Sequence, residues 1–307
     1  MFAYIIRRLT ATVLVIFGLI TLVFFLLHLL PGDAVSAMLT QFAASGKDQQ
    51  QLRHQLGLDQ PILVQYVRYL IGISHGDFGR SLFTQQAVTT VIGQQLPATL
   101  QLALASLCIA VPIGGLVGVL AAVKENSWVD RLSMTLSLTG VAMPNFWLGL
   151  MLIYVFAVLF NLLPAAGTGS LKQLILPAVS LSAFPIAVLA RLVRTSLLEV
   201  LRQDFVVTAR AKGLPERSVI FRHALRNALI PVITVVGLQF AFALGGAVIT
   251  ETVFARQGVG QIAVSAIQQR DLPVVEGTVI FVGIVVVLAN LVVDLLYGVI
   301  DPRIRAS

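Results

Sequence analysis

The chain has 307 residues, of which 57% are hydrophobic and only 11% charged, whereas soluble globular domains carry about 25% charged residues. This composition excludes an ordinary soluble domain and indicates an integral membrane protein, because a soluble fold would expose large apolar patches. The net charge of +7 fits an excess of Lys and Arg on the cytoplasmic side of a membrane and does not require a nucleic-acid partner.

The first apolar run, Leu9–Leu30, follows Arg7 and Arg8 and contains no Asp, Glu, Lys or Arg. It is longer than the apolar core of a signal peptide, about 7–15 residues, and long enough to cross a bilayer. We therefore expect a retained first transmembrane helix whose N-terminus lies in the cytosol. The more polar stretch Gly32–Pro97 would then form an external loop.

The second helix is expected over the uncharged run Ala98–Val123. Gly114 and Gly118 lie four residues apart in it, a spacing that lets another helix approach closely. A short cytosolic turn, Lys124–Arg131, would follow.

The third and fourth helices carry internal prolines. The run Leu132–Leu163 is longer than one span requires, and Pro144 is expected to kink it. The fourth helix, Leu174–Ala190, contains Pro177 and Pro185. Irregular backbone at membrane depth is tolerated only where protein or water covers it, so we expect this helix to be buried or to line a pore.

The polar stretch Arg191–Pro231 lies between long apolar runs and is rich in Lys and Arg. We expect a first helix from about Ser196 to Lys212, because Gly213 suits the left-handed position just past a helix end. Pro215 and the acid after it suit the first turn of a second helix. Four apolar residues with helical spacing give that second helix an amphipathic stripe: Phe221, Leu225, Ala228 and Leu229. A basic loop that only fixes the topology is the alternative.

The remaining chain predicts a fifth helix, Pro231–Thr250, an external segment, Glu251–Glu276, and a sixth helix, Gly277–Ile300. This topology places both termini in the cytosol and gives the inner segments the larger share of Lys and Arg.

Asp294 is the one acid that this topology places within a membrane helix. Acids at this depth are energetically costly, so a role in proton coupling is one hypothesis. The other is an ion pair with Arg191 or Arg194, which lie at the inner end of the fourth helix.

No enzyme class is indicated by the motifs. The sequence contains no Gly-x-Ser-x-Gly elbow, no His-Glu-x-x-His pair and no phosphate loop, since Asp48 follows Gly46-Lys47. The single cysteine, Cys108, excludes an intrachain disulfide, and no metal site is suggested. The chain is therefore not expected to bind or hydrolyse ATP or to hold a cofactor.

Two parts of the polar stretch resemble the EAA loop of bacterial ABC importer permeases. They are Thr208-Ala209-Arg210-Ala211-Lys212-Gly213 and His223-Ala224-Leu225-Arg226-Asn227-Ala228-Leu229-Ile230-Pro231. Val207 and Thr208 stand where the general pattern has Glu-Ala, and His223 and Arg226 stand where it has Ile and Pro. These departures are similar to the dipeptide/oligopeptide permease branch. Further motifs resemble the same branch: Pro31-Gly32-Asp33, 56–61, Gly76-Asp77-Phe78-Gly79, Glu251–Ala255, Gly258–Gln261, Arg270–Pro273 and Asp301–Arg305.

The resemblance implies an all-α membrane protein with six transmembrane helices, the type I ABC importer permease fold and both termini in the cytosol. It divides the chain into residues 1–97, a first helix with an external loop; 98–300, a five-helix transmembrane domain with a coupling loop at about 196–231; and 301–307, a cytosolic tail. It also implies specific coupling residues: Thr208, Ala209, Arg210, Lys212, Gly213, Arg217, His223 and Leu225. Among these, Gly213 would separate two helices, Leu225 would dock on an ATPase, and the basic residues would orient the joint.

The function implied is that of a permease subunit that carries di- or oligopeptides, or glutathione, across the bacterial inner membrane. The implied partners are a second homologous permease, two ATP-binding subunits that hold ATP and Mg, and a periplasmic or lipid-anchored solute-binding protein. No nucleic acid is expected, and no substrate-contacting residue is identified. The alternative function is a proton-coupled secondary transporter or channel that uses Asp294.

Overall fold

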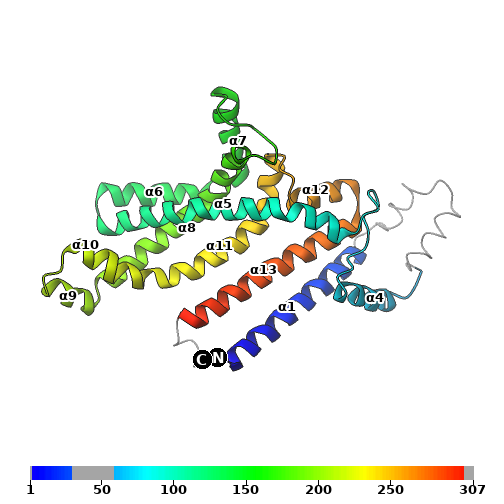
Figure 1. The fold of residues 1–307 in the computed structure, drawn as a ribbon, viewed down its shortest axis with the longest axis horizontal. Helices are drawn as coiled ribbons and strands as arrows, with labels where there is room; N and C mark the ends of the chain where they lie inside the picture. Colours follow the sequence, from blue (N-terminus) through cyan, green and yellow to red (C-terminus); the bar gives the residue numbers. More distant parts are fainter. Residues whose placement is uncertain (1, 30–58, 301–307) are drawn as a thin grey trace.

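The computed structural model describes residues 2–29 and 59–300. Within these ranges the architecture is helical, and the nearest approach to a sheet is an isolated bridge between Arg80 and Ala87. Five helices are long and apolar enough to cross a membrane, and a bent helix pair would make a sixth. The expected all-α membrane architecture is confirmed (Figure 1). The expected motifs at residues 31–33 and 56–58, and the tail at 301–307, lie outside the described residues.

Helices α1 (Phe2–Leu29) and α13 (Leu272–Ile300) run side by side (Figure 1). Their ends are joined by an ion pair of 2.7 Å between Arg8 Nη1 and Asp294 Oδ2. The predicted pairing of Asp294 with Arg191 or Arg194 is therefore wrong. The reason is that α1 lies along α13 and supplies Arg8, while Arg194 pairs with Asp130.

Helices α5 (Val88–Val123) and α8 (Leu171–Leu201) have the most extensive contact of any helix pair in the described residues. A Cβ built on Gly114 would lie 2.9 Å from the Ile186 carbonyl oxygen, and one built on Gly118 would lie 2.5 Å from the Ala190 carbonyl oxygen. The absence of side chains at these two glycines is thus what brings the two backbones together, as predicted.

The expectation that α8 is buried is also confirmed. Pro177 and Pro185 are both buried, and 56% of the apolar window of α8 is buried, the highest share among the candidate spans. Ser170 caps its first turn by accepting a hydrogen bond from the Gln173 amide, while the Gln173 side chain accepts one from the Ser170 amide.

The second span begins ten residues earlier than expected, at Val88 instead of Ala98. Pro97 lies inside the helix and does not end it, and the polar residues before it continue the helix outward. At 1.5 Å per residue, 36 residues measure about 54 Å, more than the ~30 Å hydrocarbon core. The outer turns of α5 therefore extend beyond the apolar span, and the predicted segment boundary at Ala98 falls within a helix.

The third span is broken, not merely kinked. Helix α6 (Trp128–Ala142) is followed by α7 (Asn145–Leu152) and the π-helix η1 (Ile153–Leu159), with a bend of 102° between the two arms. Met143 and Pro144 are both extended, because a proline disfavours the helical conformation of the residue before it. The predicted distortion at Pro144 is confirmed and is larger than a kink.

A buried carboxylate joins three helices at the end of the bundle where α11 ends. Glu251, near the end of α11 (Leu225–Val253), is fully buried, and its oxygens accept hydrogen bonds from the Thr99 hydroxyl at 2.6 Å and the Gly260 amide at 2.8 Å. The Gly260 amide belongs to the first turn of α12 (Val259–Gln269), where a helix favours a negative charge. A side chain at Gly258 would collide with this carboxylate. The motif therefore fastens α12 to α5 and α11.

The neighbouring Arg256 is 2% exposed, and its Nη2 lies 3.3 Å from Gln101 Oε1 and 3.4 Å from the Ala98 carbonyl oxygen. Burial lowers the pKa of this guanidinium, and the nearby Glu251 carboxylate opposes that shift. A second carboxylate, Asp271, accepts hydrogen bonds from the Ser81 hydroxyl at 2.6 Å and the Leu82 amide at 3.2 Å. It ties the chain between α4 (Ile62–Ser74) and α5 to the start of α13.

The α5–α8 contact predicts different outcomes for two neighbouring glycines. Gly118→Ala should lower the free energy of unfolding by about 1–3 kcal/mol, because the new methyl group would displace α8. Gly115→Ala is the matched control, since a Cβ there meets no atom within 4 Å. Thermal unfolding of the purified protein in detergent, followed by tryptophan fluorescence, measures the difference. Equal midpoints for the two variants would contradict the proposed close contact.

Candidate functional site

The polar stretch after α8 forms a compact helical protrusion at one end of the bundle (Figure 1). Helix α8 continues to Leu201, and a separate helix, α9 (Asp204–Ala211), follows an extended residue at Gln203. The predicted single helix from Ser196 to Lys212 is therefore wrong. No glycine or proline marks the break, and the only local signal is the acid Asp204 in the first turn of α9.

The end of α9 has the predicted geometry. Gly213 has φ of +76°, its amide donates to the Arg210 carbonyl oxygen at 2.9 Å, and the Leu214 amide donates to the Ala209 carbonyl oxygen at 3.4 Å. This pair of bonds is a Schellman motif, which requires a left-handed residue that glycine adopts without strain. The prediction for Gly213 is confirmed.

An ion pair crosses the turn at Gly213. Arg210 Nη2 and Nε donate to the two oxygens of Glu216, at 2.6 and 3.1 Å. The hydrogen bond to Glu216 raises the pKa of the Arg210 guanidinium. Because both side chains are exposed, the pair orients α9 relative to the following helix more than it stabilises the fold.

The second predicted helix is the start of a long continuous one. The helical turn α10 (Glu216–Ser218), the π-helix η2 (Val219–Ala224) and α11 follow one another without interruption, and Pro231 lies inside. The expected separation of a cytosolic helix from a fifth span at Pro231 is thus not observed.

The π-helix explains why the predicted stripe is only partly correct. Ala228 is buried, and Leu225 and Leu229 pack against the buried cluster, but Phe221 is 56% exposed. A π-turn adds one residue to a helical turn, so the residues before it face a different side of the helix than a regular α-helix would give. Val219 and Ile220 consequently take the buried positions, and Phe221 faces outward.

The predicted coupling residues divide into two groups. Ala209 is 7% exposed and Leu225 is packed inward, so both hold the protrusion onto the bundle. Leu225 is only partly buried, so its role as an apolar docking contact stays a prediction. His223 is half-buried, and its carbonyl oxygen accepts a hydrogen bond from Asn227. The exposed members of the set are Thr208, Arg210, Lys212, Gly213 and Arg217.

Four exposed apolar side chains lie among these polar ones. Together with the exposed predicted residues they make up the exposed part of the protrusion, a set of residues that we call the coupling face. Its apolar members are Phe205, Val207, Leu214 and Phe221. The coupling face therefore combines apolar contacts with Lys and Arg around a glycine-hinged turn, a composition suited to docking on another protein.

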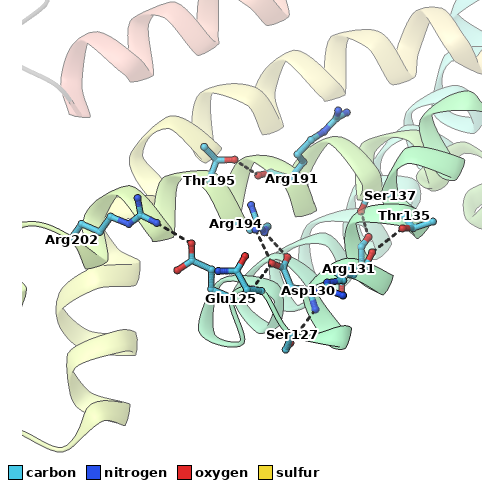
Figure 2. A network of polar contacts seen from close by, with 12 residues as sticks. Glu125, Ser127, Asp130, Arg131, Thr135, Ser137, Arg191, Arg194, Thr195 and Arg202 are labelled. Carbon is cyan, nitrogen blue, oxygen red and sulfur yellow. Dashed lines mark hydrogen bonds and ion pairs between the residues drawn. The ribbon is translucent and has the colours of Figure 1, made fainter.

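A polar network supports the protrusion from below (Figure 2). Arg194 of α8 donates two hydrogen bonds to Asp130 at the start of α6, with Nε to Oδ1 at 2.6 Å and Nη2 to Oδ2 at 2.7 Å. Asp130 is 4% exposed, and Asp130 Oδ2 also accepts a hydrogen bond from the Asn126 amide at 3.0 Å. Arg191 is exposed and points away from this pair (Figure 2).

A second, more exposed pair continues the network. Arg202, the C-cap residue of α8, donates a hydrogen bond from Nη2 to Glu125 Oε1 at 2.9 Å. Glu125 belongs to the turn between α5 and α6, and Asp130 to the first turn of α6. The C-terminal end of α8 is thus bound at two points, to the first turn of α6 and to the turn before it.

Sequence reasoning missed Asp130 as a partner of Arg194. The spacing of Ser127 and Asp130 signals a helix start, and the Ser127 hydroxyl does accept the Asp130 amide. That local signal gives no information about a guanidinium 64 residues further along the chain.

Nearly the whole chain is similar to known proteins. The family model for the binding-protein-dependent transport system inner membrane component matches residues 114–306, and the model for the N-terminal part of such components matches residues 1–103. The di/tripeptide transport system permease protein DppB of Pseudomonas aeruginosa is 42% identical over 333 residues, covering 99% of both chains. The dipeptide transport system permease protein DppB of Escherichia coli K12 is 41% identical over 336 residues, again covering 99% of both.

Among solved structures, inward-facing forms of the MetNI methionine ABC transporter contain a chain with the same fold. The TM-score is 0.61 at 20% sequence identity, and the match covers 69% of this chain and 96% of that one. At this identity the likeness concerns the fold, which is that of the type I ABC importer permeases.

Two neighbouring acids, Glu125 and Asp130, give a matched pair for testing the network. Asp130→Ala should lower the free energy of unfolding by about 2 kcal/mol, because it leaves Arg194, which is 24% exposed, without its carboxylate. Glu125→Ala should cost less than about 1 kcal/mol, because its partner Arg202 is 73% exposed. Denaturant or thermal unfolding in detergent distinguishes them, and a larger loss for Glu125→Ala would contradict this assignment.

Proposed function

We propose that this chain, which belongs to the family of binding-protein-dependent transport system inner membrane components, helps to carry di- or oligopeptides across the bacterial inner membrane. The observation that supports peptides is the identity of 41–42% along 99% of the chain to permeases named for di- and tripeptide transport. Glutathione remains within the proposed class, because it is itself a small peptide.

The proposed partners follow from the family. A second, homologous permease would complete the pathway, two ATP-binding subunits would hold ATP and Mg, and a periplasmic or lipid-anchored solute-binding protein would deliver the substrate. The chain itself would bind no cofactor, and ATP hydrolysis would take place in the ATP-binding subunits.

The coupling face supplies the proposed connection to the ATP-binding subunits. Its apolar members, Phe205, Val207, Leu214 and Phe221, would enter a groove on such a subunit, while Lys212 and Arg217 would contact its acidic rim. Movement of the face would pass to the spans by two routes. One is the continuous helix from Glu216 to Val253, and the other is α8 with its Arg194–Asp130 link to α6.

Proton coupling through Asp294 is the alternative function. Its carboxylate lies within 2.7 Å of Arg8, close to the ends of both helices. An acid held by a cation at a helix end is suited to joining two helices, and membership of a binding-protein-dependent family supports ATP-driven transport instead.

The proposed function is tested by purification and transport together. The chain, extracted from its native membrane in mild detergent, should bring down a second permease, two ATP-binding subunits and a solute-binding protein, identified by mass spectrometry. The complex in proteoliposomes should then take up radiolabelled L-alanyl-L-alanine only with ATP. Purification of the chain alone, even after cross-linking, or uptake that needs a proton gradient and no ATP, would refute the proposal.

The turn at Gly213 predicts an uncoupled variant. A β-branched residue is strained at φ of +76°, so Gly213→Val should disturb the coupling face and reduce dipeptide uptake per ATP hydrolysed by about tenfold. Gly213→Asn is the matched control, because asparagine tolerates the left-handed region. Uptake and phosphate release are measured in the same proteoliposomes. A normal ratio in Gly213→Val would contradict the coupling role of this turn.

A further inference from the structure

A cavity of about 620 Å³ lies among the central turns of α8, α11 and α13. Gln239, which lines it, is the central residue of α11, and Val286, also in the lining, is the central residue of α13. The cavity therefore lies at about the middle of the spans. Its volume is within the range of ~300–1,000 Å³ that is usual for small-molecule sites.

The lining is apolar apart from three primary amides, those of Asn145, Gln239 and Asn290. None of the described residues that line the cavity is charged. A ligand with a free ammonium or carboxylate at this depth would need a counter-ion. The lining therefore suits a neutral polar group.

Two of the three amides are incompletely satisfied. Gln239 Oε1 and Asn290 Oδ1 are buried and form no hydrogen bond among the described residues, and Gln239 as a whole is 5% exposed. A buried amide without a partner costs several kcal/mol in a hydrocarbon environment. A hydrocarbon tail donates no hydrogen bond, so a lipid chain in the cavity would leave these oxygens unsatisfied.

The third amide lies at the break of the third span. Asn145 is the first residue of α7, immediately after the extended pair Met143 and Pro144. Its backbone carbonyl oxygen accepts a hydrogen bond from the Ser180 hydroxyl at 3.0 Å. Irregular backbone at membrane depth is tolerated where it lines a polar path or is covered by protein. The break thus opens on the same cavity as the two unsatisfied amides.

We propose that this cavity binds the peptide bond of the transported peptide, and that Gln239 and Asn290 recognise its N–H and C=O groups. A primary amide carries a carbonyl acceptor and two N–H donors, so it is complementary to a peptide bond. This inference rests on the proposed function and deepens it. The charged ends of the peptide would be balanced by groups outside this lining, because none of the described lining residues is charged.

Reconstituted transport of L-alanyl-L-alanine tests the proposal. Gln239→Leu and Asn290→Leu place an apolar side chain of similar size at each position and remove its hydrogen bonds. In the complete complex with saturating solute-binding protein, each should lower the maximal uptake rate by roughly threefold to tenfold. ATP hydrolysis stimulated by the loaded binding protein should be unchanged. Gln94→Leu is the matched control, since Gln94 is an exposed amide of α5 outside the cavity and should leave uptake unchanged.

Cysteine labelling gives a second measurement that does not depend on the binding protein. In a Cys108→Ala background, Val286→Cys places one thiol in the cavity lining. L-alanyl-L-alanine should slow its reaction with N-ethylmaleimide, and added Gln239→Leu should abolish this protection.

Three results would overturn the proposal. Unchanged uptake in both leucine variants, with no protection of the thiol, would show that the peptide bond is not bound here. Loss of the second permease from the leucine variants during purification would show that the cavity is a subunit interface. Absence of ATP-dependent dipeptide uptake by the unaltered complex would refute the proposed function as well, whereas the first two results leave that function standing.

Discussion

The close approach of α5 and α8 is the contact on which the rest of the structure depends. Gly114 and Gly118 let the two backbones touch, and this fixes the rotation and height of α8 within the bundle. With α8 in that register, Arg194 meets Asp130 at the start of α6, and Arg202 meets Glu125 in the adjoining turn. The chain then leaves α8 at a defined point and direction, so the position of α9 and the coupling face follows from two glycines in another helix.

Buried polar groups are treated in two contrasting ways along α11. Near its C-terminal end Glu251 is enclosed and accepts hydrogen bonds from a hydroxyl and two amides, which holds that corner in place. At its centre Gln239 has a carbonyl oxygen without a partner. Satisfied polar groups rigidify their surroundings, whereas an unsatisfied one leaves a favourable contact to be made by something else. The same helix therefore carries both a structural anchor and the proposed recognition group.

Apolar run length and glycine or proline chemistry made much of this architecture predictable. They indicated an all-helical membrane protein, the helix pairing at Gly114, the distortion at Pro144 and the left-handed turn at Gly213. They failed where a choice depended on tertiary contact. The break after Leu201 lacks a glycine or proline, the π-turn that exposes Phe221 leaves no mark in the sequence, and the partners of Asp294 and Arg194 lie in helices distant along the chain. The helix end at Gly213 was thus predicted correctly, while the burial of the side chains around it was predicted only in part.

The helix that begins at Glu216 and ends at Val253 has 38 residues without interruption. At 1.5 Å per residue its length is about 57 Å. One end borders the coupling face, the middle lines the central cavity, and the far end holds the Glu251 corner. A single continuous helix therefore connects the two ends of the bundle. The π-helix at 219–224 and Pro231 are the two places where this helix could bend, and both lie near the end that borders the coupling face. Tilting that end would swing the opposite end the other way, so opening on one side and closing on the other would be one movement.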